Sequence, residues 1–329
     1  MISNIGKMKE YLVRRISPEE TYADLLKFPR YLEVETINSC NARCPMCPNV
    51  ERPRNMKPMK DELFKKIADE IIEHKEEVRR VTLYRDGEPL LDNKLADRIA
   101  LLKKHGIKAT SISTNVSLLT ESKAKDLLNA GIDIVIMSID SLDKASYAAI
   151  RCGLDFDVVI KNALKFIEIR NKTRPETQIW MRMIRQKSNY GEWPAYRKYW
   201  SRYLSKSDRV YYHDIFNWGG QLKNFKPISK SFEPNLPCVA LWSLFVIFCN
   251  GDVPLCNVDY RNLYPSGNVK ATSIARIWRS EVFNERRRAH LAGNKNRISL
   301  CGNCNVWNES VDGKNISLDY AREVDIKTP

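Results

Sequence analysis

The sequence predicts an α/β protein with a parallel sheet, because short apolar runs alternate with helical patterns along most of the chain. The six runs, all rich in β-branched or aromatic residues, are Tyr31–Ile37, Val81–Tyr84, Ala109–Ser113, Ile134–Ile139, Ile179–Ile184 and Val210–Ile215. Helical patterns separate them, such as Glu62–Val78 and Glu121–Ala130, the second of which is followed by Gly131. Six units of this kind suit either an open, partial (β/α)6 barrel or a doubly wound sheet.

The regions before and after these six units have a different pattern. In the N-terminal extension, residues 1–30, we expect a short helix to begin at Ser17, because Ser17-Pro18-Glu19-Glu20 combines an N-cap, a proline at the first helical position and a capping-box glutamate. The six units occupy residues 31–218, and a polar, lysine-bearing linker follows at 219–237.

Residues 238–329 are expected to form a small α+β domain. The apolar run Leu244–Phe248 precedes an Asn250-Gly251 turn, which is typical of a β-hairpin. A helix is expected over Ile274–His290, with Ile277, Trp278 and Phe283 on its apolar side.

Composition limits the classes of function. The 329-residue chain has no run of eighteen apolar residues and no apolar N-terminal signal, so we expect a cytoplasmic protein without a membrane span. Nine cysteines then indicate metal or thiol chemistry rather than disulfides. The formal net charge of +14 is spread along amphipathic helices, and no nucleic-acid-binding motif accompanies it.

Three cysteines, Cys40, Cys44 and Cys47, follow the first predicted strand with the spacing C-x3-C-x2-C. Three thiolates can bind three irons of a [4Fe–4S] cluster and leave the fourth iron free for a ligand. A structural zinc site usually needs four ligands, commonly in C-x2-C pairs, so this spacing favours the cluster over zinc.

A second group of cysteines lies in the C-terminal region. Its members are Cys238, Cys256, Cys301 and Cys304, the last two with the spacing C-x2-C. Four thiolates can hold a complete [4Fe–4S] cluster or a zinc ion.

The first cysteine loop and the strand ends that follow it resemble the radical SAM superfamily. In that family the open iron binds S-adenosylmethionine (SAM), and one electron frees a 5′-deoxyadenosyl radical. The resemblance implies a radical SAM core at residues 31–218, folded as an open, partial (β/α)6 TIM-like barrel. It also implies a set of SAM-binding positions, namely Met46, Gly87, Glu88, Pro89, Ser113, Asn115, Ser138, Asp140 and Arg182. The chain departs from the family's Gly-Gly-Glu-Pro segment at Asp86, and from its usual aromatic residue at Met46.

The C-terminal cysteines resemble a Twitch domain, a shortened SPASM domain that carries one auxiliary [4Fe–4S] cluster. The layout is similar to that of the aminocyclitol and aminosugar dehydrogenases and epimerases of this group. It implies hydrogen abstraction from a small polar substrate, followed by oxidation or epimerisation. Two alternatives stay open: an enzyme that modifies a ribosomal peptide, as an epimerase or cross-link former, and a non-catalytic iron–sulfur protein.

Two further residues are candidates for the chemistry at carbon. Cys249, within the auxiliary-cluster unit, is a possible hydrogen donor, although a small buried core residue is the simpler interpretation. His213, at the end of the sixth strand, is a possible base, and a structural histidine is as consistent with the sequence. An acidic flavodoxin or ferredoxin is the expected electron donor for so basic a chain.

Overall fold

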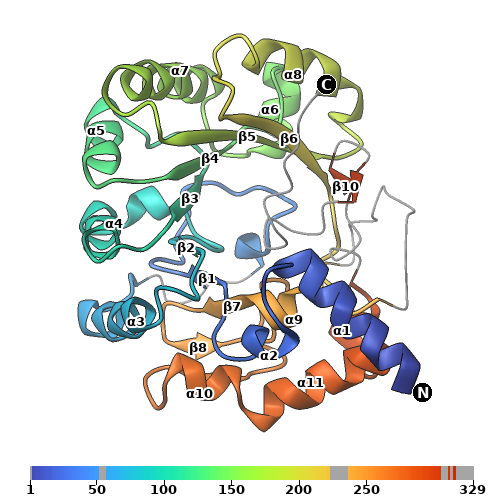
Figure 1. Cartoon of the computed structure of the whole chain (residues 1–329). Helices are drawn as coiled ribbons and strands as arrows, with labels where there is room; N and C mark the ends of the chain where they lie inside the picture. Colours follow the sequence, from blue (N-terminus) through green and yellow to red (C-terminus); the bar gives the residue numbers. More distant parts are fainter. Residues whose placement is uncertain (1, 52–56, 223–235, 305–309, 312–313, 316–329) are drawn as a thin grey trace.

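The computed structural model describes residues 2–51, 57–222, 236–304, 310–311 and 314–315, and the predicted linker therefore lies mostly outside the described residues. The main feature is a parallel sheet with the strand order β6-β5-β4-β3-β2-β1-β7 (Figure 1). Its strands are β1 (Tyr31–Val34), β2 (Arg80–Thr82), β3 (Thr110–Thr114), β4 (Ile134–Ser138), β5 (Gln178–Arg185), β6 (Arg209–Asp214) and β7 (Leu244–Ile247). All six predicted strands are present at their expected places.

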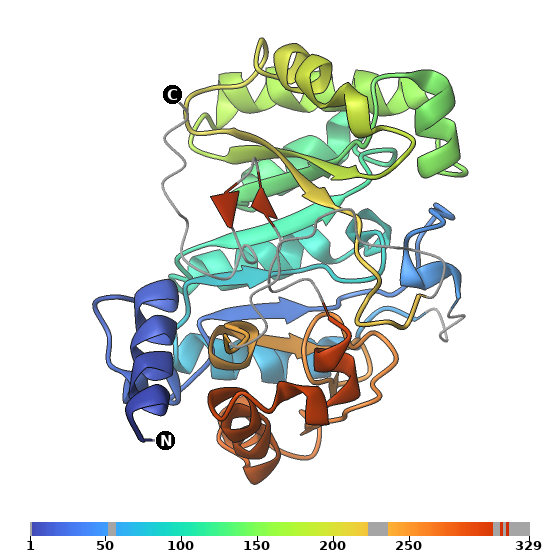
Figure 2. The ribbon, with the colours of Figure 1, turned by 90° about the vertical axis from the view of Figure 1, so that its right-hand side faces the viewer.

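Strands β1 to β6 follow one another across the sheet without a reversal of direction. Crossover connections have a fixed hand, so this order places the connecting helices on one face, whereas a doubly wound sheet requires a reversal. The helices between the strands are α3 (Asp61–Glu73), α4 (Leu95–Lys104), α5 (Glu121–Asn129), α6 (Lys144–Ile150), α7 (Phe156–Thr173) and α8 (Trp193–Trp200). They lie along the outer side of the curved sheet (Figures 1 and 2), which confirms the partial barrel.

Local signals explain the bounds of these helices. Helix α5 begins after Thr120, whose hydroxyl accepts a hydrogen bond from the Lys123 amide, and ends just before Gly131, which has φ 88°. Helix α3 buries Leu63, Ile67 and Ile71 at helical spacing, but it ends at Glu73 rather than at the predicted Val78.

The N-terminal extension differs from the prediction. Helix α1 (Ile2–Ile16) ends just before Ser17, and the next helix, α2 (Tyr22–Leu25), begins after Thr21. Thr21 and Asp24 form a complete capping box, whereas the Ser17 hydroxyl donates its hydrogen bond to Glu19. The predicted helix start at Ser17 is therefore wrong, because the competing cap lies four residues further on.

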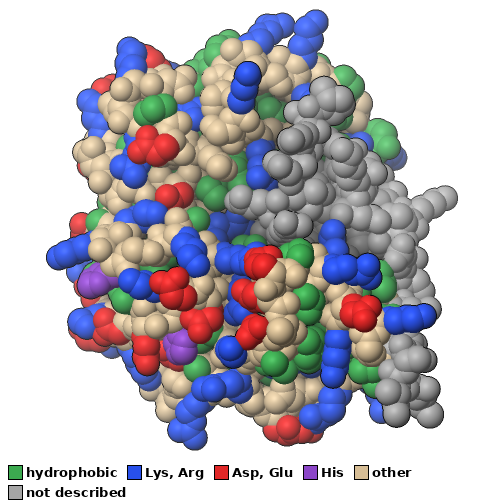
Figure 3. Space-filling view, viewed as in Figure 1, with side chains coloured by type: hydrophobic (Ala, Val, Ile, Leu, Met, Phe, Trp, Pro, Cys, Tyr) green, Lys and Arg blue, Asp and Glu red, His purple; other side chains and the backbone are tan. Residues whose placement is uncertain are grey.

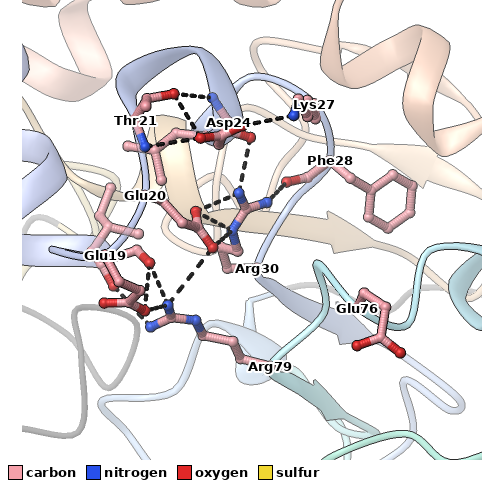
Figure 4. Close-up of polar contacts among 12 residues, drawn as sticks. Glu19, Glu20, Thr21, Asp24, Lys27, Phe28, Arg30, Glu76 and Arg79 are labelled. Carbon is pink, nitrogen blue, oxygen red and sulfur yellow. Dashed lines mark hydrogen bonds and ion pairs between the residues drawn. The ribbon is translucent and has the colours of Figure 1, made fainter.

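Two arginines fix this extension to the start of the sheet (Figure 4). The side chain of Arg30, which directly precedes β1, is 1% exposed and donates to Glu20 at 2.5 Å and to the Asp24 carbonyl at 2.9 Å. Arg79, which directly precedes β2, pairs with Glu19. These contacts tie the turn before α2 to the first two strands.

The C-terminal region contains α9 (Ala240–Ser243), β7, the antiparallel pair β8 (Asp252–Val253) and β9 (Gly267–Asn268), and the helices α10 (Ile274–Trp278), α11 (Glu281–Leu291) and α12 (Ser299–Gly302). Strand β7 does not pair with the strand that follows it. It lies beside β1 in the main sheet (Figure 2). In the register of this pair, Leu32 lies opposite Phe245.

Two sequence predictions in this region are therefore corrected. The two halves of the predicted hairpin belong to different sheets, although the turn is present, with Gly251 at φ 88° and the Phe248 amide bonded to the Asp252 carbonyl. The predicted helix Ile274–His290 is two helices, because Ser280 caps α11 with its hydroxyl.

The remaining short elements are the 3-10 helices η1 (Pro48–Val50), η2 (Pro89–Leu91), η3 (Tyr190–Glu192) and η4 (Lys295–Arg297) and the strands β10 (Ser310–Val311) and β11 (Lys314–Asn315). Among the described helices, none has the length and apolar character needed to cross a bilayer. On the face in Figure 3, lysine and arginine side chains are interspersed with acidic ones.

Candidate SAM and iron–sulfur site

The first cysteine loop begins where β1 ends, at the carboxyl edge of the sheet. Alternate residues of the loop point inward: Ala42, Cys44 and Met46 are buried and pack with Ile150 and Ile215. This apolar packing explains why a loop without regular structure has a defined path.

The three cysteines line one cleft at the carboxyl edge of the sheet. The sequence-predicted SAM-binding residues that share the cleft with the cysteines are Met46, Gly87, Glu88, Ser113, Asn115, Ser138 and Arg182. Pro89 and Asp140 do not line it.

Gly87 allows the β2–α4 loop to approach the cysteine loop closely. A Cβ atom at this position would lie 2.8 Å from the Ser39 carbonyl oxygen and closer still to that of Ile37. The next residue, Glu88, donates its amide to the Ser39 carbonyl at 2.7 Å, and the Asn49 side chain donates to the carbonyls of Asn38 and Asp86. The two loops therefore form one unit.

The Glu88 carboxylate holds the end of β3. It accepts hydrogen bonds from the Thr114 hydroxyl at 2.7 Å, the Asn115 amide at 2.8 Å and the Leu90 amide at 3.1 Å. Burial nevertheless raises the pKa of Glu88 above its ordinary value. Its contacts within the protein position Asn115, whose own side chain faces the cleft.

Arg182 lies on β5 and donates to two serines on neighbouring strands. The distances from its Nη2 atom are 2.9 Å to the Ser113 hydroxyl and 2.7 Å to the Ser138 hydroxyl. Its buried Nε atom has no hydrogen-bond partner among the described residues. A cation with an unused donor beside a cleft suits a carboxylate such as that of SAM.

Burial disfavours the charged form of the three thiols in the first loop. Burial raises the pKa values of Cys40 and Cys44, and it raises the pKa of Cys47 to about 12. Uncharged buried thiols lose their protons when a metal supplies the compensating charge. Within the described residues, no three Cys, His or carboxylate side chains converge on a single ion. A cluster requires no such convergence, because each iron binds its own thiolate.

The second group of cysteines comes from separate parts of the C-terminal region. Cys238 precedes α9, Cys256 follows β8, Cys301 lies in α12 and Cys304 follows that helix. Burial raises the pKa of Cys256, and the neighbouring thiols of Cys304 and Cys238 raise it further. The four side chains are thus close enough to interact electrostatically, as ligands of one cluster must be.

Two residues beside this second group, His290 and Lys295, are not marked by any sequence pattern as functional. The buried His290 ring accepts a hydrogen bond at Nδ1 from the Cys238 amide at 3.2 Å, and burial lowers its pKa to about 3, so the ring is neutral. Burial also lowers the pKa of Lys295 to about 8, although the cysteine thiols around it oppose this shift. A cation here would offset the negative charge of four thiolates.

The two candidate catalytic residues lie outside the described lining of the cleft. The Cys249 amide donates to the Glu35 carboxylate at 3.0 Å, and the His213 ring packs edge-on against Tyr211. By contrast, Trp218 does line the cleft, and its indole donates to the Met46 carbonyl at 3.2 Å.

A further cleft residue, Arg151, was not among the sequence candidates. It lies at the end of α6, donates from Nη1 to the Cys44 sulfur at 3.8 Å and pairs with Asp140 at 2.7 Å. Asp140 also accepts the Ile184 amide at 2.7 Å, so both of its carboxylate oxygens are used within the protein. This explains its place outside the cleft.

Comparison with known proteins agrees with this geometry. The sequence profile of the radical SAM superfamily matches residues 34–178, and that of an iron–sulfur cluster-binding domain, SPASM, matches residues 238–305. A cofactor-modifying protein of tungsten-containing aldehyde ferredoxin oxidoreductase from Pyrococcus furiosus is 29% identical over 171 residues, which is 52% of this chain and 48% of the relative. The chain spans about half the length of the curated relatives it matches.

Solved structures match a larger part of the chain. BtrN in complex with AdoMet and 2-DOIA has a TM-score of 0.59 at 20% identity, covering 90% of this chain and 99% of BtrN. Native anSMEcpe with bound AdoMet and Cp18Cys peptide has a TM-score of 0.60 at 18% identity, covering 89% and 93%. At these identities the likeness concerns the fold. The two profile matches show that this chain contains a radical SAM domain, followed by an iron–sulfur cluster-binding domain of the SPASM type.

Proposed function

We propose that this protein is an enzyme that cleaves SAM reductively and removes a hydrogen atom from a small polar substrate, such as a sugar or an aminocyclitol. The substrate is then oxidised or epimerised with the help of an auxiliary [4Fe–4S] cluster. The observation that carries the proposal is the single cleft in which the three-cysteine loop meets the ends of β2, β3, β4 and β5. Ligands of α/β barrels bind at this edge of the sheet.

Particular residues would hold the cofactors in this proposal. Cys40, Cys44 and Cys47 would bind the SAM cluster, and Arg182 would meet the SAM carboxylate. When bound, the cluster and SAM supply a 5′-deoxyadenosyl radical after one-electron reduction. The apolar cleft residues Ile184 and Phe216 would exclude water from that radical.

One residue of the cleft contacts the loop that follows Cys256. Arg85, which lines the cleft, donates to the Asn257 carbonyl at 2.5 Å, and Asn257 directly follows Cys256. The Gln221 side chain donates to the Val258 carbonyl at 2.8 Å in the same loop. This connection supports a direct part for the auxiliary cluster, as an acceptor of the second electron when an alcohol becomes a ketone.

The place of Cys249 favours oxidation over epimerisation within this proposal. A thiol that returns hydrogen to carbon must reach the substrate, whereas Cys249 lies outside the described lining of the cleft. Turnover of a Cys249→Ala variant is therefore expected to continue. Loss of turnover with both clusters intact would favour the epimerase, with Cys249 as the hydrogen donor.

A second candidate is an enzyme that modifies a ribosomal peptide. The specific support is the fold likeness to anSMEcpe with bound Cp18Cys peptide, which covers 93% of that chain. A substrate deuterated at the reacting carbon distinguishes the two candidates, because deuterium appears in 5′-deoxyadenosine only with the correct class of substrate.

The first experiment measures iron and sulfide after anaerobic reconstitution, together with 5′-deoxyadenosine formed after reduction. At four irons per cluster we expect about eight irons in the wild type and about four when Cys40, Cys44 and Cys47 are all replaced by alanine. Absence of SAM cleavage in the fully loaded protein would favour a non-catalytic iron–sulfur protein. A reduced flavodoxin or ferredoxin is the proposed electron donor, and it should support SAM cleavage in place of a chemical reductant.

A further inference from the structure

We propose that Arg151 raises the reduction potential of the cluster held by the first cysteine loop, and that Asp140 is the residue that positions it. The Arg151 guanidinium is shared between two partners. Nη1 lies 3.8 Å from the Cys44 sulfur, and Nε lies 2.7 Å from Asp140. The inference rests on the proposed role of Cys44 as an iron ligand.

The surrounding backbone holds Arg151 against the cysteine loop. Its amide donates to the Tyr147 carbonyl at 2.7 Å and so ends helix α6. The next residue, Cys152, accepts a hydrogen bond at its carbonyl from the Arg43 amide at 2.8 Å, and Gly153 turns the chain with φ 87°. The turn after α6 and the cysteine loop thus move together.

Asp140 restricts the direction in which the guanidinium points. Its side chain is fully buried, and its second oxygen accepts the Ile184 amide on β5 at 2.7 Å. The carboxylate is therefore anchored to the sheet, and its ion pair with Nε leaves the other edge of the guanidinium facing Cys44. Arginine suits this arrangement because its planar fork binds two partners at once.

The charge then acts where little water screens it, because the Arg151 side chain is only 11% exposed. Reduction adds one negative charge to a cluster, and hydrogen bonds to the cluster sulfurs are among the groups that set its potential. A cation beside one sulfur ligand stabilises the reduced state and raises the potential. The electron comes from the reduced flavodoxin- or ferredoxin-type donor, and no bond in the protein changes.

The test is a redox titration of the reconstituted protein. The titration is monitored through the EPR signal of the cluster that changes when SAM is added. The main variant is Asp140→Asn combined with Arg151→Met, which removes both charges and leaves neither one buried alone. We expect the equilibrium constant for reduction to fall at least tenfold. For a one-electron couple, a tenfold fall lowers the reduction potential by about 59 mV. A wild-type potential in this variant would overturn the inference.

Arg43→Gln is the matched control. Arg43 belongs to the same loop, but it is exposed and donates to the carbonyls of Cys40 and Ala42 rather than to a sulfur. We expect it to keep the wild-type potential, and a shift equal to that of the double variant would show a general charge effect and count against Arg151.

Two further variants keep the result interpretable. Arg151→Lys retains the charge, but a single ammonium cannot contact both Asp140 and Cys44. The reduction potential of the cluster in this variant should therefore fall below that of the wild type. If the double variant takes up no cluster, the potential of Arg151→Lys is the test of the inference. Cys44→Ala should lose the SAM-responsive cluster. If Cys44→Ala keeps that cluster, the assignment of Cys44 as an iron ligand is wrong. If Cys44→Ala loses the cluster but the Arg151 variants keep the wild-type potential, only the present inference is wrong.

Discussion

The indole of Trp218 donates a hydrogen bond to the backbone carbonyl of Met46, at 3.2 Å. Met46 lies between the second and third cysteines of the first loop, and Trp218 follows the last strand of the six-unit series. The Trp218 ring also packs edge-on against the ring of Tyr260, in the loop after Cys256, and the two ring centroids are 5.8 Å apart. One side chain therefore contacts both cysteine-bearing regions.

The Trp218→Phe substitution should weaken SAM binding. It retains most of the ring but leaves the Met46 carbonyl without its donor, at a cost of about 1 kcal/mol, or roughly a fivefold higher Kd. Equilibrium binding of SAM to the reconstituted protein measures this. Trp193→Phe, whose ring packs against Tyr196 and Tyr212 away from the cleft, should leave the Kd unchanged.

The Gly87→Ala substitution should prevent assembly of the SAM cluster. The new methyl group would overlap the carbonyl oxygens of Ile37 and Ser39, so the cysteine loop would have to shift. We expect iron to fall from about eight to about four per chain. Gly191→Ala is the control, because nothing lies within 4 Å of its added Cβ. A full complement of iron in Gly87→Ala would show that the loop tolerates the displacement.

The Arg182→Lys substitution tests the proposed SAM carboxylate site. Lysine cannot reproduce the planar donors that reach Ser113, Ser138 and a ligand together. Loss of a charge-assisted hydrogen bond costs about 1.5–3 kcal/mol, so the Kd for SAM should rise at least tenfold. Arg185→Lys, on the same strand but paired with Asp214 outside the cleft, should bind SAM normally. Equal losses in both variants would indicate a general effect on β5.

Glu88 should make stability fall as pH rises. Burial raises its folded-state pKa above the ordinary 4.5, so the folded protein keeps the proton to higher pH than the unfolded chain does. The stabilising contribution of Glu88 is complete below pH 4.5 and is lost as pH rises through the raised pKa. The loss is about 1.4 kcal/mol for each pH unit that separates the folded-state pKa from the unfolded-state pKa.

Urea unfolding of wild type and Glu88→Gln at several pH values above 4.5 tests this. The difference in unfolding free energy, wild type minus variant, should decrease with pH, since glutamine has no proton to release. A constant difference for Glu88→Gln would contradict the raised pKa.

The sequence predicted those features that depend on short-range patterns. The spacing of Cys40, Cys44 and Cys47 and the alternation of apolar runs with helices are local, and the structure places each where it was expected. The order of strand ends then brought Ser113, Ser138 and Arg182 together, because parallel strands end at one edge of the sheet.

Features that depend on long-range pairing were missed. The Asn250-Gly251 turn signals a hairpin, but the free edge of β1 provides a partner for Leu244–Ile247, and that pairing prevails. Arg151 lies 107 residues from Cys44 in the sequence, and no local pattern marks a buried cation. Asp140 shares its strand end with Ser138, and only the position of Arg151 shows that it turns away from the cleft.

The pairing of β7 with β1 has a consequence for the evolution and engineering of this protein. The SPASM-type region contributes a strand to the sheet of the radical SAM region, so each region completes the other. Excision of residues 238–329 would expose the edge of β1 and separate β7 from its only described partner strand. Chimeras with related enzymes are therefore expected to fold only when β1 and β7 are exchanged as a pair.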